Sequence, residues 1–174
     1  MQIIKTLYHP EVHTLENKSI FTRLATRSIT VQEDAILLLY TARYEDYSLP
    51  GGGLDLGEDK VSGMVRELSE ETGATNINNI KPFGAYEEYR PWHKPDYDIQ
   101  YMISYCYTCE IDKELGSANL ESHEINNGMN AIWINIHEAI SHNIETMATS
   151  SKKGMSIERE TFLLQLIADR VVNK

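Results

Sequence analysis

The chain has 174 residues, of which 41% are hydrophobic and 24% charged, as expected for one globular domain with a sizeable core. Its net charge of −10 argues against nucleic acid or an anionic membrane as the main partner, because both require a basic surface. No apolar run reaches the ~18 residues of a membrane span, and the first residues lack a signal-peptide pattern. We therefore expect a cytoplasmic protein.

The first half of the chain begins with a segment of mixed polarity, residues 1–20, which we interpret as an N-terminal extension of a domain that spans residues 21–174. Residues 28–40 are predicted to form two short strands around a polar turn at residues 32–34. A glycine-rich loop follows. Residues 59–72 then show the three- and four-residue spacing of an amphipathic helix, and Gly73 is placed as its C-terminal stop.

The second half alternates strands and helices. Two segments rich in β-branched and aromatic residues are predicted strands, and the segment between them, with two prolines, is a predicted loop. A further strand and two helices follow, the last of them capped by Ser156. This order predicts an α+β protein built in layers. The ranges are strands 77–89, 99–110 and 131–136, a loop at 90–98, and helices 137–147 and 157–172.

Three glutamates share one face of the predicted helix at residues 59–72. At ~100° per residue, Glu70 and Glu71 lie within roughly 60° of Glu67. The centre of the apolar stripe lies about 110° away. The helix is thus expected to pack by its apolar side and to present the three carboxylates to a neighbouring cleft.

Such a cluster of carboxylates costs stability unless a cation compensates it, because like charges at this spacing repel and the helix C-terminus disfavours anions. An oxygen-only ligand set suits Mg²⁺, with Mn²⁺ as a substitute. The preceding glycines can bring the backbone close to a phosphate or a metal. Arg66 could pair with Glu58 or steady Glu70. Carboxylates and a glycine loop together suit water attack on a phosphoryl group.

The segment GGLDLGEDKVSGMVRELSEETGA resembles the Nudix box of the Nudix hydrolases. The box requires a glycine, five residues, a glutamate, seven residues, and then Arg-Glu-apolar-x-Glu-Glu-x-Gly-apolar. One departure is Gly63, where members of the family usually have alanine, and we expect it to loosen the helix by up to ~1 kcal/mol. Every fixed position is filled, by Gly52, Glu58, Arg66, Glu67, Leu68, Glu70, Glu71, Gly73 and Ala74.

The resemblance implies an α/β/α sandwich around a mixed sheet, with the box as a loop–helix–loop. It implies hydrolysis of a pyrophosphate bond in a nucleoside diphosphate derivative. The substrate could be a nucleotide-sugar, ADP-ribose or a nucleoside triphosphate. By the same resemblance, the metal ligands are the glutamates of the box and the backbone carbonyl of the preceding glycine. Arg66 orients these glutamates with Glu58 as its partner. The implied ligands are Gly51, Glu67, Glu70 and Glu71.

Many family members add a glutamate from a later loop, as a base or as a metal ligand. Glu121 and Glu124 both precede a tryptophan-bearing strand, as the acidic stretch of the family does, and Glu124 is our preferred candidate of the two. Asp112 and Glu114 also remain open. Plain surface charge explains Glu121 and Glu124 about equally well.

An acidic enzyme for phosphorylated substrates needs local cations, and three arginines flank the first predicted strands. Arg27 and Arg43 are retained as candidates for substrate binding, with Arg23 beside them and structural salt bridges as the alternative. Tyr89 is the preferred aromatic candidate for stacking on a base, although most aromatic residues only pack. The alternatives are Tyr44, Tyr47, Tyr86 and Trp92.

Two other motifs are interpreted as structural. Cys106 and Cys109 have redox or zinc spacing, but three-residue spacing in a strand places the thiols on opposite faces. His9 and His13 resemble a zinc pair, but Pro10 disrupts the helix that such a pair requires.

Two other functions stay open. The chain could be a non-catalytic sensor of a nucleotide derivative, or an isomerase of a diphosphate, which would need a catalytic cysteine. A homodimer through the N-terminal extension is an open alternative to a monomer.

Overall fold

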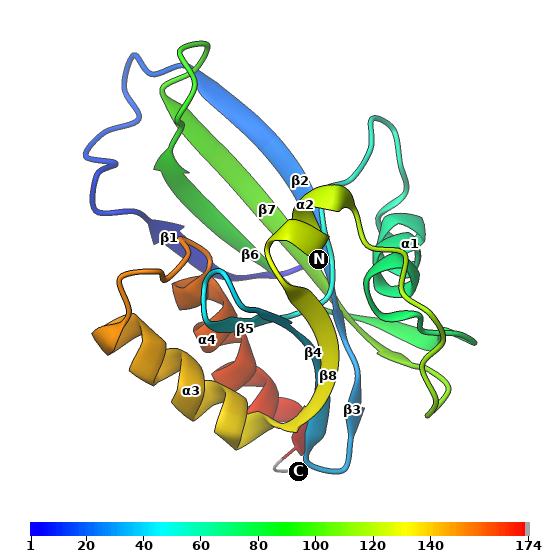
Figure 1. Cartoon of the computed structure of the whole chain (residues 1–174). Coiled ribbons are helices and arrows are strands. Elements are labelled where there is room, and N and C mark those ends of the chain that lie inside the picture. The colour runs from blue at the N-terminus through cyan, green and yellow to red at the C-terminus, as the bar shows by residue number, and fades with distance from the viewer. Residues whose placement is uncertain (173–174) are drawn as a thin grey trace.

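The computed structural model describes residues 1–172 and contains two β-sheets with helices on both sides (Figure 1). The first sheet has the order β1-β6-β7-β2 and is mixed. Both β1 (Ile3–Tyr8) with β6 (Asn78–Pro91) and β2 (Ile20–Ile29) with β7 (Ile99–Glu110) pair in parallel, whereas β6 and β7 are antiparallel. The strand at the start of the chain was not predicted, because the first 20 residues have mixed polarity; in the structure its side chains are exposed or half-buried.

The second sheet is antiparallel and is built around β4 (Ala35–Thr41), which pairs with β3 (Val31–Gln32), β5 (Asp46–Ser48) and β8 (Met129–Asn135). The predicted polar turn joins β3 to β4. Because four consecutive residues of β4, 36–39, are at most 1% exposed, both faces of this sheet are covered. That burial on two faces is what an α/β/α sandwich requires.

The helices lie on opposite sides of the sheets. Figure 1 shows α1 on one side and α3 with α4 on the other. Leu37 packs in the apolar cluster beneath α1, and its neighbour Leu38 packs in the cluster with α4. Cys109 and Cys106 divide between the same two clusters, and both are free and buried, as the strand spacing predicts. The helical segments are α1 (Lys60–Thr72), α2 (Ser122–Asn126), α3 (Ile136–Thr149), α4 (Ile157–Ile167) and the π-helical η1 (Ala168–Val172).

The elements predicted after residue 28 agree with the structure to within a few residues, but most of β2, the short strand β5 and the short helix α2 were not predicted. Two details of the last helix also differ. Ser156 is the N-cap residue of α4, but its side chain makes no capping hydrogen bond. The last helix changes to π geometry at Ala168 instead of continuing regularly to Val172. No helix among residues 1–172 has the length and apolar character needed to cross a membrane.

Candidate active site

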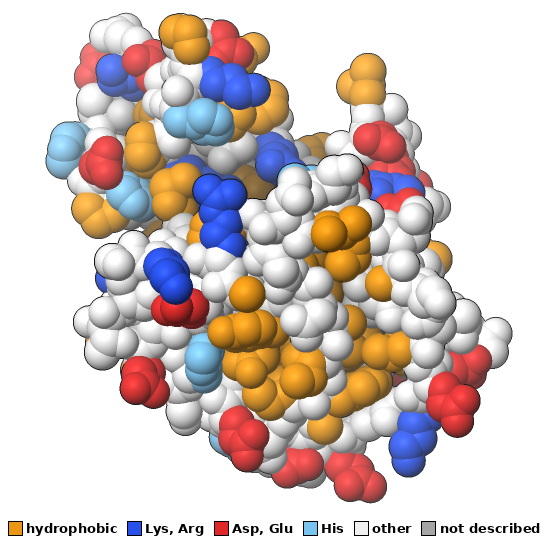
Figure 2. Space-filling model, viewed as in Figure 1, with side chains coloured by type: hydrophobic (Ala, Val, Ile, Leu, Met, Phe, Trp, Pro, Cys, Tyr) orange, Lys and Arg blue, Asp and Glu red, His pale blue; other side chains and the backbone are white. Residues whose placement is uncertain are grey.

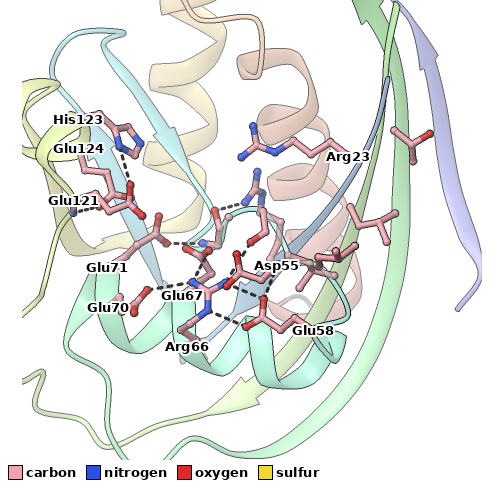
Figure 3. A pocket seen from close by; sticks show the side chains of 18 of the residues that line it. Arg23, Asp55, Glu58, Arg66, Glu67, Glu70, Glu71, Glu121, His123 and Glu124 are labelled. Carbon is pink, nitrogen blue, oxygen red and sulfur yellow. Dashed lines mark hydrogen bonds and ion pairs between the residues drawn. The ribbon is translucent and has the colours of Figure 1, made fainter. Parts of the chain in front are cut away.

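A pocket of about 1220 Å³ lies where α1, the glycine loop, β2 and α2 meet. In Figure 2 this region is a notch between the upper end of the mixed sheet and the loop before α1, with basic and acidic side chains along it. Figure 3 shows the carboxylates of α1 and α2 pointing toward this space. Its charged lining comes from four segments of the chain and consists of Arg23, Arg27, Asp55, Glu58, Arg66, Glu67, Glu70, Glu71, Glu121 and Glu124.

The helix that carries the box is capped at both ends. The carboxylate of Asp59 accepts hydrogen bonds from the backbone N–H groups of Val61 and Ser62, each at 3.0 Å. Gly73 closes the helix with a φ of 72°, a left-handed conformation that glycine adopts without strain. The contacts of the helix also explain why glycine and not alanine stands at position 63, because a Cβ there would collide with the side chain of Leu54. These features fix the helix against the loop before it.

The three glutamates of α1 enter the pocket to different depths. Glu71 is only 4% exposed. The side chain of Glu67 is 13% exposed and that of Glu70 is 43% exposed. The predicted acidic face thus goes from buried at Glu71 to half-exposed at Glu70 around the helix and not along it.

Arg66 holds the outer part of this acidic face. Its guanidinium donates two parallel hydrogen bonds to Glu58, at 2.9 and 3.0 Å, and further bonds to Glu67 at 2.9 Å and Glu70 at 3.2 Å. Both pairings expected from the sequence therefore occur together. The hydrogen bonds that Arg66 donates to Glu58 lower the pKa of Glu58 to about 2, and the same hydrogen bonds raise the pKa of Arg66. Glu58 and Arg66 form a fixed ion pair at neutral pH.

Glu71 lies deeper and has no such ion pair. Its carboxylate accepts a hydrogen bond from the backbone N–H of Gly51 at 2.6 Å. Burial raises the pKa of Glu71 to about 8, the N–H of Gly51 and the charge of Arg27 oppose this shift, and the charges of Glu67 and Glu124 add to it. A buried carboxylate beside two others is an environment that a cation would stabilise.

The glycine loop makes close contacts that only glycine permits. Gly51 has a φ of 140°, and a Cβ there would collide with the carbonyl of Thr26. A Cβ on Gly52 would lie 2.6 Å from the carboxylate of Glu67. The backbone of β2 holds the loop in place, since Thr26 N–H donates to the carbonyl of Gly52 at 2.9 Å. The carbonyl of Gly51, expected as a metal ligand, accepts a hydrogen bond from Arg27.

The later glutamate that reaches the pocket comes from the short helix α2. Glu124 is 8% exposed, and its Oε2 accepts the backbone N–H of Glu121 at 2.6 Å. Glu121 also lines the pocket, but its side chain is 73% exposed and pairs with His123. Asp112 binds Thr75 and Asn76. Asp112 and Glu114 are not among the residues that line the pocket.

The three residues expected to bind substrate are separated in space. Arg27 lines the pocket, whereas Arg43 and Tyr89 are not among the residues that line it. The guanidinium of Arg43 donates to the side chain of Asn127 at 3.0 Å. Tyr89 is stacked between Tyr8 and Tyr101, with ring centroids 4.8 and 4.5 Å away. Tyr89 thus belongs to a ladder of tyrosines across three strands.

Four further residues line the pocket, of which Arg23 and Trp92 were weighed from the sequence and Phe21 and His123 were not. Arg23 is exposed, and its side chain has no hydrogen bond or ion pair with any of residues 1–172. Phe21 and Trp92 form an aromatic pair at the pocket, with centroids 4.8 Å apart. His123 lines the pocket from α2. Its position had no signal in the sequence, and for Arg23 the only signal was its position beside the first strands.

The donor chemistry of the site fits a divalent hard cation, although the side chains are not yet arranged around one. Among residues 1–172 no group of three His, Cys, Asp or Glu side chains is placed to hold a metal ion. The reason is visible in the contacts, since Arg66 binds Glu67 and Glu70 while Gly51 binds Glu71. The donors are nevertheless all oxygens, and their negative charge exceeds that of the cations beside them, which suits Mg²⁺ or Mn²⁺.

Comparisons with known proteins agree with this geometry. The family model described as "NUDIX domain" matches residues 22–156, well over half of the chain. A solved NUDIX hydrolase from Nitrosomonas europaea superposes with a TM-score of 0.57 at 16% identity, over 86% of this chain and 92% of that chain. At this identity the superposition shows a shared fold.

Two curated relatives match shorter segments. An RNA pyrophosphohydrolase from Ruthia magnifica subsp. Calyptogena magnifica is 30% identical over 73 residues, which are 42% of this chain and 40% of that protein. An 8-oxo-(d)GTP phosphatase from Mycolicibacterium smegmatis is 43% identical over 42 residues, which are 24% of this chain and 13% of that protein. The chain therefore spans less than half the length of either relative.

Proposed function

Because the chain belongs to the NUDIX family, we propose that it hydrolyses a pyrophosphate bond in a nucleoside diphosphate derivative, using Mg²⁺ or Mn²⁺. The observation that carries this proposal is the pocket in which Glu67, Glu70 and Glu71 of α1 meet Glu124 of α2. One curated relative is named as an RNA pyrophosphohydrolase and the other as an 8-oxo-(d)GTP phosphatase, and both names support the same chemistry.

NUDIX hydrolases generally use divalent metal ions, and the three glutamates of α1 would hold them here. A bound divalent ion would neutralise charge on the phosphoryl groups and make phosphorus more electrophilic. Arg66 keeps Glu67 and Glu70 in the pocket, and Glu58 keeps Arg66 in place. The Gly51 carbonyl accepts a hydrogen bond from Arg27, and its second lone pair would be the one available to a metal ion.

Glu124 is the proposed general base. Its Oε2 accepts the N–H of Glu121, so Oε1 is the atom that would take the proton from the attacking water. The carboxylate is mostly buried and lines the same pocket as the proposed metal ligands. A base must lie within hydrogen-bond reach of the water that it activates, and this position permits that.

The other end of the pocket suits a nucleoside. Phe21 and Trp92 offer flat apolar surfaces on which a base can stack. The guanidinium of Arg23, which has no partner among residues 1–172, lies nearby for a phosphate. We propose that the base binds toward Trp92 and the reacting phosphates toward α1. A nucleotide-sugar, ADP-ribose and a nucleoside triphosphate all meet this description.

The test is a panel assay with Mg²⁺ that includes nucleoside triphosphates, ADP-ribose, other nucleotide-sugars and dinucleoside polyphosphates. Glu70→Gln and Glu71→Gln should abolish hydrolysis of the preferred compound. The matched control is Glu145→Gln, the same chemical change at an exposed position of α3, which should hydrolyse like the wild type.

The results separate the two candidate functions. Turnover that requires Mg²⁺ and both pocket glutamates supports the hydrolase. Tight Mg²⁺-dependent binding of one compound without turnover would favour the non-catalytic sensor instead.

A further inference from the structure

A line of five charged side chains extends from the pocket toward the far side of β6. Arg27, Glu160, Arg159 and Glu88 are buried, and Arg90 is half-buried at the end. The charges alternate along the line, with Arg159 donating to Glu160 and to Glu88, each at 2.7 Å. Arg90 lies 3.4 Å from Glu88, and Arg27 lies 3.8 Å from Glu160. One end of this line is therefore part of the proposed active site.

Glu160 of α4 is the residue through which this line reaches the glycine loop. Its Oε1 accepts two hydrogen bonds from Arg159, at 3.0 and 2.7 Å, and is the oxygen nearest Arg27. Its Oε2 accepts the backbone N–H of Leu49 at 3.0 Å. Leu49 stands two residues before Gly51. Each oxygen of this fully buried carboxylate thus has a separate task.

The glycine loop is held from three directions, and Glu160 supplies one of them. On the β2 side, Ser28 N–H donates to the carbonyl of Pro50 at 2.8 Å. On the α1 side, Gly51 N–H donates to Glu71 at 2.6 Å. On the α4 side, Glu160 holds the N–H of Leu49. The position of the loop relative to the carboxylates of α1 depends on all three.

We propose that Glu160 is a positioning residue, which places both Arg27 and the glycine loop against the carboxylates of α1. Stability alone is a weak explanation for this arrangement, because buried ion pairs often contribute little compared with apolar residues of the same volume. The inference rests on the proposed hydrolysis for its effect on rate, but its structural part can be measured without any substrate.

Glu160→Gln tests the proposal because an amide cannot do what this carboxylate does. Glutamine has one acceptor oxygen and one donor nitrogen. If the amide oxygen faces Arg159, the N–H₂ group faces the N–H of Leu49, which is also a donor. In the reverse orientation the N–H₂ group faces the guanidinium groups, which are donors as well. One of the two tasks of Glu160 is lost in either case.

Glu88→Gln is the matched control. It removes one negative charge from the same buried line, and Glu88 also contacts Arg159, at 2.7 Å. Glu88 contacts neither Arg27 nor the glycine loop. A difference between the two variants therefore reports on position and not on the loss of a buried charge.

The first measurement is amide hydrogen exchange. In Glu160→Gln the amides of Leu49 and Gly51 should exchange about tenfold faster or more, while those of the β4 core change only with global stability. Glu88→Gln should leave the loop as protected as in the wild type. Loop protection that is equal in the two variants would overturn the proposal.

The second measurement is a double-mutant cycle on kcat/KM with Arg27→Lys. Because Glu160 and Arg27 act together, their effects should be non-additive by a factor of about five or more, whereas Glu88→Gln and Arg27→Lys should be additive. Additivity in both cycles would refute a positioning role. A wild type that hydrolyses nothing in the panel would refute the proposed function, and the exchange measurement would still decide whether Glu160 positions the loop.

Discussion

The substitution Gly52→Ala should inactivate the protein without unfolding it. A Cβ at Gly52 would lie 2.6 Å from the carboxylate of Glu67, whereas ordinary contacts of this kind begin at 3.4 Å. The carboxylate must therefore move by about 0.8 Å, and misplacement of about 1 Å in an active site can cost ~100-fold in rate. The clash is with the end of a side chain that borders a pocket, so we expect the free energy of unfolding to change by less than about 1 kcal/mol.

The assay compares kcat/KM for the preferred Mg²⁺–nucleotide substrate with the thermal unfolding midpoint. The control is Gly154→Ala, because a Cβ there meets its nearest atom, in the ring of Tyr44, at an ordinary 3.5 Å. Gly154→Ala should match the wild type in both measurements. If Gly52→Ala retained full kcat/KM, the close packing of the loop on Glu67 would have no catalytic role and the reasoning would be wrong.

Three further predictions concern binding, pH dependence and the core. Trp92→Ala should raise KM for the nucleotide about 5- to 10-fold with little change in kcat if the ring stacks on the base; an unchanged KM would exclude stacking. Burial raises the pKa of Asp46 from 3.8 to about 6, so the folded state holds this proton more tightly and stability falls as the pH rises through that window. Asp46→Asn should thus unfold at a higher temperature than the wild type at neutral pH, by an amount corresponding to on the order of 2 kcal/mol, and equal stabilities there would contradict this. Leu38 is fully buried against α4, so Leu38→Ala should lower the free energy of unfolding by about 2 to 5 kcal/mol in urea titration, whereas a loss below about 1 kcal/mol would mean that the core closes over the gap.

The helix that carries the acidic face could be predicted almost completely from the sequence. Its start at Asp59, its end at Gly73 and the shared face of Glu67, Glu70 and Glu71 follow from interactions within a few residues. Capping and helical periodicity are local properties, so they do not depend on the rest of the fold. The strands β4, β6, β7 and β8 were also predicted, because their burial requires continuous apolar and β-branched segments, whereas β1 and most of β2 were not.

The remaining parts of the site depend on contacts between segments far apart in the chain. The sequence offered Glu121, Glu124, Asp112 and Glu114 as later acids, and only the position of α2 brings the first two to the pocket. The sequence alone could not show that Arg43 would bind Asn127 instead of lining the pocket. Strand register and loop paths decide such contacts, and neither is encoded within a short stretch of sequence.

The sequence by itself determined the family resemblance, the α+β layers and the acidic face of α1, since each follows from local spacing and composition. Only the tertiary structure decided which cations and aromatic rings share the pocket with that face. It also revealed Glu160, which lies 111 positions from Leu49 and yet holds its backbone N–H. A buried carboxylate in a helix carries no mark of its partners, because these partners come from whichever elements pack against it.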